Sequence, residues 1–167
     1  MNIDKLFENE HYLRQEIDFF IKKKHIVKIN ENKELTKSFL KKAKHNFEFY
    51  KINKKNNAFN DWLIVILYYS LYHAALALIT NKQYSSKNHH ATIIILIREY
   101  GISKAEADLL HTLSINKQDA ELYTNLKKDR HTASYQTDNI FNQKSINSYE
   151  SQVLEFIQKT EEIIQNS

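Results

Sequence analysis

The stretch from Arg130 to Tyr135, which reads Arg-His-Thr-Ala-Ser-Tyr, brings together side chains that could act on a phosphodiester. The guanidinium of Arg130 carries a fixed positive charge, and its fork of donors matches the geometry of a phosphate. His131 can take up or release a proton near neutral pH, and the phenol of Tyr135 can donate a hydrogen bond. The alternative is an exposed helix end, at which Arg130 and His131 interact favourably with the helix dipole.

Cleavage of RNA without a metal ion needs a base for the ribose 2′-hydroxyl, a donor for the leaving oxygen and a cation for the charged phosphorane. Arg130 is the candidate cation. His131 and Tyr135 are the candidate proton carriers, although tyrosine is a poor base at neutral pH because its reference pKa of about 10 keeps it protonated. On a continuing helix His131 stacks over Tyr135 one turn later, so the two side chains could also simply pack together. We interpret Arg130, His131 and Tyr135 as the candidate catalytic residues.

Lys127 and Lys128 lie three and two residues before Arg130 and are candidate contacts to RNA phosphates. Lysine runs are most often solvated helix faces, and this alternative stays open. His90 is a third candidate RNA contact, or else a hydrogen-bonded residue at a helix start. His89 precedes it, but adjacent histidines at a helix start diverge and no carboxylate neighbours them in the sequence. We therefore expect no metal site and no cofactor.

The other histidines suggest no chemistry. His73 lies in an apolar stretch and is expected to be a hydrogen-bonded core residue. The remaining four show no pattern beyond surface placement: His11, His25, His45 and His111.

Composition indicates an all-α protein. The 167 residues suffice for one domain with a hydrophobic core. They include one glycine, Gly101, and no proline, so the residues that tight β-turns need are almost absent. The absence of cysteine fits the reducing cytoplasm, where we expect the protein to reside. A net charge of +4 is compatible with an acidic partner such as RNA.

Residues 62–79 contain no formal charge, which reaches the length threshold for a membrane-spanning helix. Tyrosines and a histidine in the middle of this segment argue against lipid exposure. The segment is instead expected to be the buried central helix of a bundle, and no membrane association is expected.

Periodicity predicts an antiparallel bundle of five or six helices. The first helix is expected from residue 2 to about 26, followed by a polar link ending at a cap near Asn32. Further helices are expected at about 34–50, 60–80, 91–100 and 146–165, with polar connections between them. Gly101 suits a left-handed helix end, and Ser103 with Glu106 forms a capping-box pattern that starts the next helix. That helix is expected to extend to about residue 133, with a possible break at 114–116.

Several blocks resemble the HEPN-domain family. Residues 68–78, Tyr-Tyr-Ser-Leu-Tyr-His-Ala-Ala-Leu-Ala-Leu, resemble the central helix of that family. Residues 88–92, Asn-His-His-Ala-Thr, resemble its next, histidine-containing helix start. Residues 130–135 resemble its Arg-x-x-Ala-Asp-Tyr signature with Ser134 in place of the aspartate, and Phe156-Ile157 resembles the end of its last helix. The resemblance covers residues 34–167, which we treat as a HEPN-like bundle, with residues 1–33 as a helical extension.

This resemblance implies a homodimer that places two copies of the arginine segment across one cleft. Active members of the family are metal-independent endoribonucleases, many of them toxins paired with a nucleotidyltransferase antitoxin. Their signature is arginine, four to six residues and histidine, whereas Tyr135 follows Arg130 after four residues and no histidine follows His131. Because Arg130 keeps its companions Ala133 and Tyr135, we nevertheless expect a toxin-like or RNA-processing endoribonuclease that acts on single-stranded RNA at the dimer cleft. The alternatives are a weak or inactive module that binds nucleotide or RNA or pairs with a nucleotidyltransferase, and a purely structural adaptor.

Overall fold

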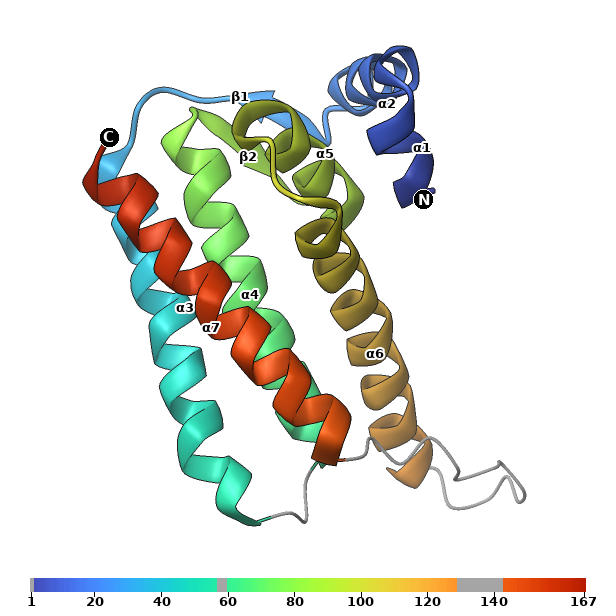
Figure 1. Ribbon diagram of the computed structural model, residues 1–167, viewed down its shortest axis with the longest axis vertical. Coiled ribbons are helices and arrows are strands. Elements are labelled where there is room, and N and C mark those ends of the chain that lie inside the picture. The colour runs from blue at the N-terminus through green and yellow to red at the C-terminus, as the bar shows by residue number, and fades with distance from the viewer. Residues whose placement is uncertain (1, 57–59, 129–142) are drawn as a thin grey trace.

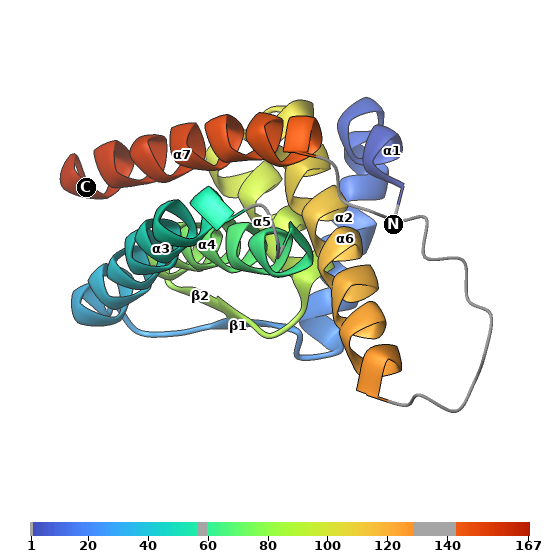
Figure 2. The ribbon, with the colours of Figure 1, turned by 90° about the horizontal axis from the view of Figure 1, so that it is seen from below.

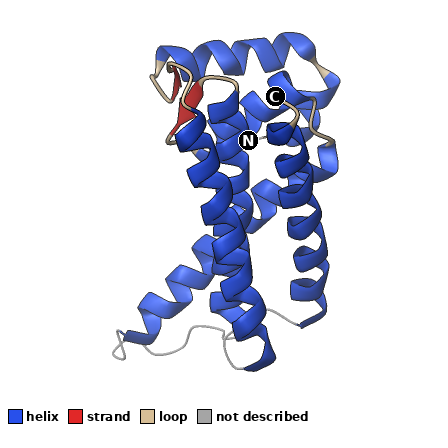
Figure 3. Ribbon diagram, turned by 90° about the vertical axis from the view of Figure 1, so that its left-hand side faces the viewer, coloured by secondary structure: helices blue, strands red, loops and turns tan. Residues whose placement is uncertain are grey.

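The computed structural model describes residues 2–56, 60–128 and 143–167, and within residues 118–128 only the helical backbone. The described residues form seven α-helices, a short 3₁₀ helix and two three-residue strands, which confirms the all-α class (Figure 3). The elements are α1 (Ile3–Glu8), α2 (Glu10–Lys22), β1 (Ile26–Lys28), α3 (Lys33–Asn53), η1 (Lys54–Asn56), α4 (Asn60–Asn81), β2 (Tyr84–Ser86), α5 (His89–Tyr100), α6 (Lys104–Lys128) and α7 (Gln143–Gln165).

Helix α4 is the centre of the bundle and contacts α3, α5, α6, α7 and β2. Its length and composition would allow it to cross a membrane, but 72% of its most apolar 18-residue window is buried inside the protein. Side chains on all sides of α4 are buried, as expected for a helix surrounded by protein. The prediction of a buried central helix is confirmed.

The four long helices α3, α4, α6 and α7 alternate in direction along the bundle (Figure 1). Helix α3 ends, α4 begins, α6 ends and α7 begins at the same end of the molecule, which is the lower end in Figure 1. The strands and α5 lie toward the opposite end. Lys128, the last residue of α6, therefore lies at the lower end.

Asparagine side chains start several helices, which gives a local function to part of the asparagine-rich composition. Four asparagines, Asn2, Asn9, Asn32 and Asn88, each accept a hydrogen bond from the backbone N–H three residues later.

The prediction of a single N-terminal helix over residues 2–26 is wrong. Asn9 adopts an extended backbone and caps α2, which separates α1 from α2.

Two predicted helix signals are confirmed around Gly101. This residue ends α5 with φ of 55°, in the left-handed region that glycine adopts without a steric penalty. The Ser103 hydroxyl accepts from the Glu106 N–H at 3.2 Å, and the Glu106 carboxylate accepts from the Ser103 N–H at 2.7 Å. Both halves of the capping box are therefore formed.

Two other expectations need correction. Helix α6 is continuous through residues 114–116, where a break was considered possible. The polar connection at 81–88 contains β2, which pairs antiparallel with β1 in the register Ile26 to Ser86. Tyr84 of β2 is buried, and its hydroxyl accepts a hydrogen bond from Arg98 at 2.6 Å.

The N-terminal helices belong to the same hydrophobic core as the bundle. Helices α1 and α2 lie against α6 and α5, respectively (Figure 2). Their buried side chains join the core formed by α3–α7, and these side chains are Ile3, Leu6, Ile17 and Phe20.

Candidate functional site

The predicted catalytic residues Arg130, His131 and Tyr135 lie outside the described residues. Lys127 and Lys128 are the last two residues of α6, and their backbone is helical up to that point. The structure thus brings the backbone of the two lysines to the lower end of the bundle, and Lys128 is two residues before Arg130 in the chain.

His90 lies in a cluster of three imidazoles, which we call the histidine cluster: His89, His90 and His111. The first two open α5, and His111 comes from the second turn of α6. Ring centroids are 5.8 Å apart for His89 and His90, 5.5 Å for His90 and His111, and 6.5 Å for His89 and His111. The two adjacent histidines therefore do not diverge, because both rings lie against the same residue of α6.

Tyrosines of α4 form the inner wall of the cluster. The rings of Tyr68 and Tyr72 stack on each other at 5.5 Å, and each lies 6.0 Å from the ring of His89. The ammonium of Lys117, from α6, lies 5.7 Å from the centroid of Tyr68 and 5.5 Å from that of Tyr69. Tyr69, which belongs to the segment expected to be buried, is 37% exposed and lies at the surface beside this wall.

Three ring nitrogens of the histidine cluster are buried and make no hydrogen bond within the described part of the chain: Nδ1 and Nε2 of His89, and Nδ1 of His111. A buried polar atom without a partner costs about 1–3 kcal/mol. His90 and His111 are themselves only half-buried, so the cluster reaches solvent through them. The unpartnered nitrogens give the cluster unused hydrogen-bonding capacity, and the half-buried rings place that capacity next to the surface.

The histidines of the cluster are neutral near pH 7. Burial, together with the charges of His90 and His111, lowers the pKa of His89 to about 3. Burial also lowers the pKa of His90 and of His111, while the Asp108 carboxylate one turn earlier on α6 acts to raise the pKa of His111. Each neutral ring offers one N–H donor and one acceptor nitrogen.

The histidine cluster and the lysines at the end of α6 are separate sites within one chain. His111 and Lys127 are sixteen residues apart on a continuous helix. At about 1.5 Å per residue this corresponds to about 24 Å along the helix axis. His90 therefore does not lie beside Lys127 and Lys128, the other two candidate RNA contacts.

His73 is hydrogen-bonded, as expected, but it is half-buried and is not the core residue that was predicted. Its Nδ1 lies 2.6 Å from the carbonyl oxygen of Tyr69 and 3.4 Å from the side-chain nitrogen of Asn46. These contacts place it between α3 and α4 and give it a packing role.

His111 is the site residue that the sequence interpretation missed, because it was assigned to the surface. One signal was present. Ala107, Leu110 and Ser114 are buried and form one stripe of α6, and His111 lies at the edge of this stripe. The spacing along α6 cannot reveal that His111 lies against His89 and His90 of α5.

Most of the chain matches a family model. The family model described as HEPN domain matches residues 36–166, which include the central helix, the histidine cluster, Arg130 and the last helix. Neither a curated protein nor a solved structure matches the chain.

Proposed function

Because the chain belongs to the HEPN-domain family, whose role is related to nucleotides and RNA, we propose that it is a metal-independent endoribonuclease acting on single-stranded RNA. The observation that carries this proposal is the family match over residues 36–166, which contains the Arg130 stretch in its expected order after the central helix.

In this proposal Arg130 neutralises the charge that develops on the scissile phosphate. His131 or Tyr135 moves the proton of the 2′-hydroxyl, and histidine is the better base because it titrates near neutral pH. Lys127 and Lys128 attract the phosphates on either side. This proposal is supported by the end of α6, where Lys127 and Lys128 lie three and two residues before Arg130 in the chain.

We propose that two copies of the chain form the cleft. Exposed apolar side chains near the lower half of the bundle support an interface there. Trp62 and Tyr69 are 48% and 37% exposed and lie seven residues apart on α4, which places them on one face of the helix. Phe49 and Ile52, on the adjoining end of α3, are 53% and 70% exposed.

Incubation of the purified protein with mixed single-stranded RNA, with and without a chelator, tests the activity. We expect cleavage that persists in the chelator and is lost in Arg130→Ala. Arg14→Ala is the matched control, because Arg14 is an exposed arginine of α2 that pairs only with Glu10 among the described residues. Equal cleavage by the wild type and Arg130→Ala would refute the proposal.

A second candidate function is a binding module without nuclease chemistry that pairs with a nucleotidyltransferase antitoxin. The observation in its favour is Tyr135 at the position of the family histidine, with no histidine after His131. This function predicts binding of RNA that weakens in Arg130→Ala, and no cleavage at any pH.

If the protein does cleave RNA, His131→Gln identifies the proton carrier. A His131→Gln variant that cleaves like the wild type would leave Tyr135 as the proton carrier, and Tyr135→Phe then tests that role.

A further inference from the structure

We propose that the histidine cluster is a binding site for a phosphate group, separate from the Arg130 stretch. The phosphate can belong to a free nucleotide or to the backbone of RNA. The RNA form of this inference rests on the proposed function, whereas the nucleotide form does not.

The donors of the cluster come from different elements and meet at one place. His89 and His90 come from the start of α5 and His111 from α6, with ring centroids 5.5–6.5 Å apart. Three neutral imidazoles offer three N–H donors, and the buried nitrogens of His89 and His111 have no acceptor among the described residues. A phosphate has several oxygens in a tetrahedral arrangement, so one group can accept from several rings at once.

The surroundings favour an anion over a cation. The ammonium of Lys117 lies 5.7 Å from the ring of Tyr68, and that ring lies 6.0 Å from His89. The Asp108 carboxylate, which acts to raise the pKa of His111, is the charge that opposes a bound anion. A metal ion would need ligand atoms directed at one point, and the described residues contain no group of three histidines, cysteines or carboxylates arranged in that way.

A bound phosphate should cause the cluster to take up protons. The rings are neutral without a ligand because burial lowers their pKa values. A nearby negative charge favours the protonated imidazole and raises these values. Burial raises the pKa of Tyr72 on α4, so its phenol provides no opposing charge at neutral pH. For each proton taken up, the affinity falls by about tenfold per pH unit as the pH rises.

The test measures binding on the full chain with three probes: inorganic phosphate, adenosine monophosphate and a 2′-O-methyl RNA hexamer. The hexamer cannot be cleaved through the 2′-oxygen, and its diester charge does not change between pH 5.5 and 7. NMR resonances of the histidine rings report the site. We expect each probe to shift the resonances of His89, His90 and His111, and the hexamer to bind at least about tenfold more weakly at pH 7 than at pH 5.5.

His111→Gln and His90→Gln should each weaken binding of the hexamer by about tenfold or more at pH 5.5 and reduce its pH dependence. His45→Gln is the matched control, because His45 is an exposed histidine of α3 outside the cluster. Circular dichroism at both pH values confirms that each variant is folded. Binding that is unchanged in both cluster variants would overturn the inference. The inference would also be overturned if the probes shifted the resonances of His11, His25 and His45 as much as those of the cluster. The same holds if the cluster resonances responded to zinc but not to phosphate.

The two proposals can fail separately. Phosphate binding that depends on the cluster, in a protein that does not cleave RNA, would leave the inference standing and refute the nuclease. Cleavage that depends on Arg130, with phosphate binding unaffected by His90→Gln and His111→Gln, would support the nuclease and overturn the phosphate site.

Discussion

Helices α4 and α6 have similar lengths, 22 and 25 residues, but different relations to the rest of the protein. Helix α4 is surrounded by other elements, and thirteen of its residues are buried. Helix α6 packs into the core through its first turns and then continues to Lys128 at the lower end of the bundle. Helix α4 thus contributes mainly to the hydrophobic core. Helix α6 carries candidate functional residues at two places, at His111 and at its basic end.

This difference means that stability and function can be changed independently. Substitutions in α4 should act mainly on the free energy of unfolding. Those toward the end of α6 should act mainly on binding. The histidine cluster, in which His111 of α6 meets the start of α5 beside tyrosines of α4, should affect both.

The largest effect on stability is expected for Leu71→Ala, because Leu71 is fully buried at the middle of α4. Removing a buried leucine side chain typically lowers the free energy of unfolding by about 2–5 kcal/mol. Ile115→Ala on α6 is the control, since Ile115 is 45% exposed and its truncation should cost about 1 kcal/mol or less. Urea denaturation measures the loss in the free energy of unfolding of both variants. Similar losses in the two would contradict the prediction.

The next effect is a loss of stability in acid through His89. The pKa of His89 is about 3 in the folded protein and about 6.5 when unfolded, so the unfolded state binds the proton more tightly. This contribution is complete above pH 6.5 and is lost as the pH falls from 6.5 toward 3, by about 2 kcal/mol at pH 5. Urea denaturation at pH 7 and 5 measures it. His89→Phe should reduce the loss, whereas His45→Gln should leave it unchanged.

A smaller effect is expected at the junction of α5 and α6. Gly101→Ala places a β-carbon on a residue with φ of 55°, and no atom lies within 4 Å of that carbon. The cost is therefore conformational, about 1 kcal/mol. Gln83→Gly provides the opposite change, because Gln83 also has a positive φ, of 62°. Thermal unfolding should show a lower Tm for the first variant and an equal or higher Tm for the second.

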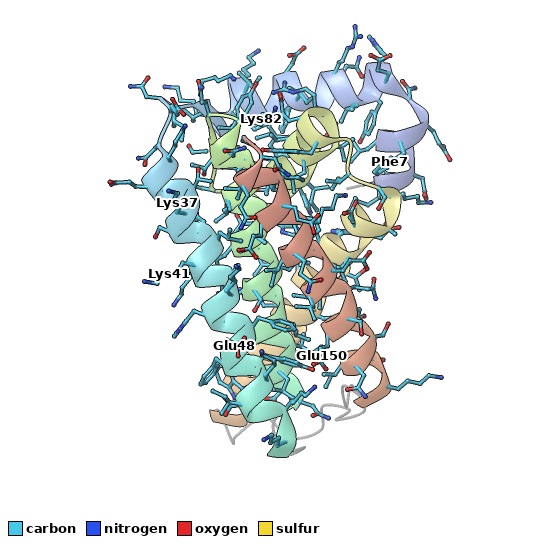
Figure 4. The ribbon with its side chains drawn as sticks, turned by 60° about the vertical axis from the view of Figure 1, so that its left-hand side comes forward. Phe7, Lys37, Lys41, Glu48, Lys82 and Glu150 are labelled. Carbon is cyan, nitrogen blue, oxygen red and sulfur yellow. The ribbon has the colours of Figure 1, made fainter. Side chains whose placement is uncertain are left out.

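The smallest effect on stability is expected for Lys127→Ala combined with Lys128→Ala, within about 0.5 kcal/mol. RNA binding should nevertheless weaken, and its salt dependence should fall by about one unit of slope or slightly more. Lys37→Ala combined with Lys41→Ala is the control, because these lysines are exposed on the outer side of α3 (Figure 4). Equal losses of RNA affinity in both pairs would show that net charge alone determines binding.

Local signals in the sequence predicted much of the fold. The stripes of α3 and α7, the apolar α4, the glycine at the end of α5 and the capping box before α6 depend on residues close in the chain. The pairing of β1 with β2 joins Ile26 to Ser86, and no short-range pattern encodes such a distant contact. The extended Asn9 was missed because helical spacing continues on both sides of it.

The candidate site was predicted less completely, for a similar reason. His89 and His90 were noticed because they are adjacent in the sequence. Their contact with His111 depends on how α5 packs against α6, which only the folded chain reveals. The proposed roles of Arg130, His131 and Tyr135 rest on the residue types and on the family match, since these residues lie outside the described part of the chain.

The pairing of β1 with β2 has a practical consequence for shortened forms of this protein. A fragment starting at residue 36, where the family match begins, would lack β1 and leave the backbone of β2 without its partner strand. It would also uncover the core surface beneath Ile17, Phe20 and Ile26. An unpaired strand edge beside newly exposed apolar surface favours self-association. Such a fragment should aggregate at concentrations at which the full chain stays in solution.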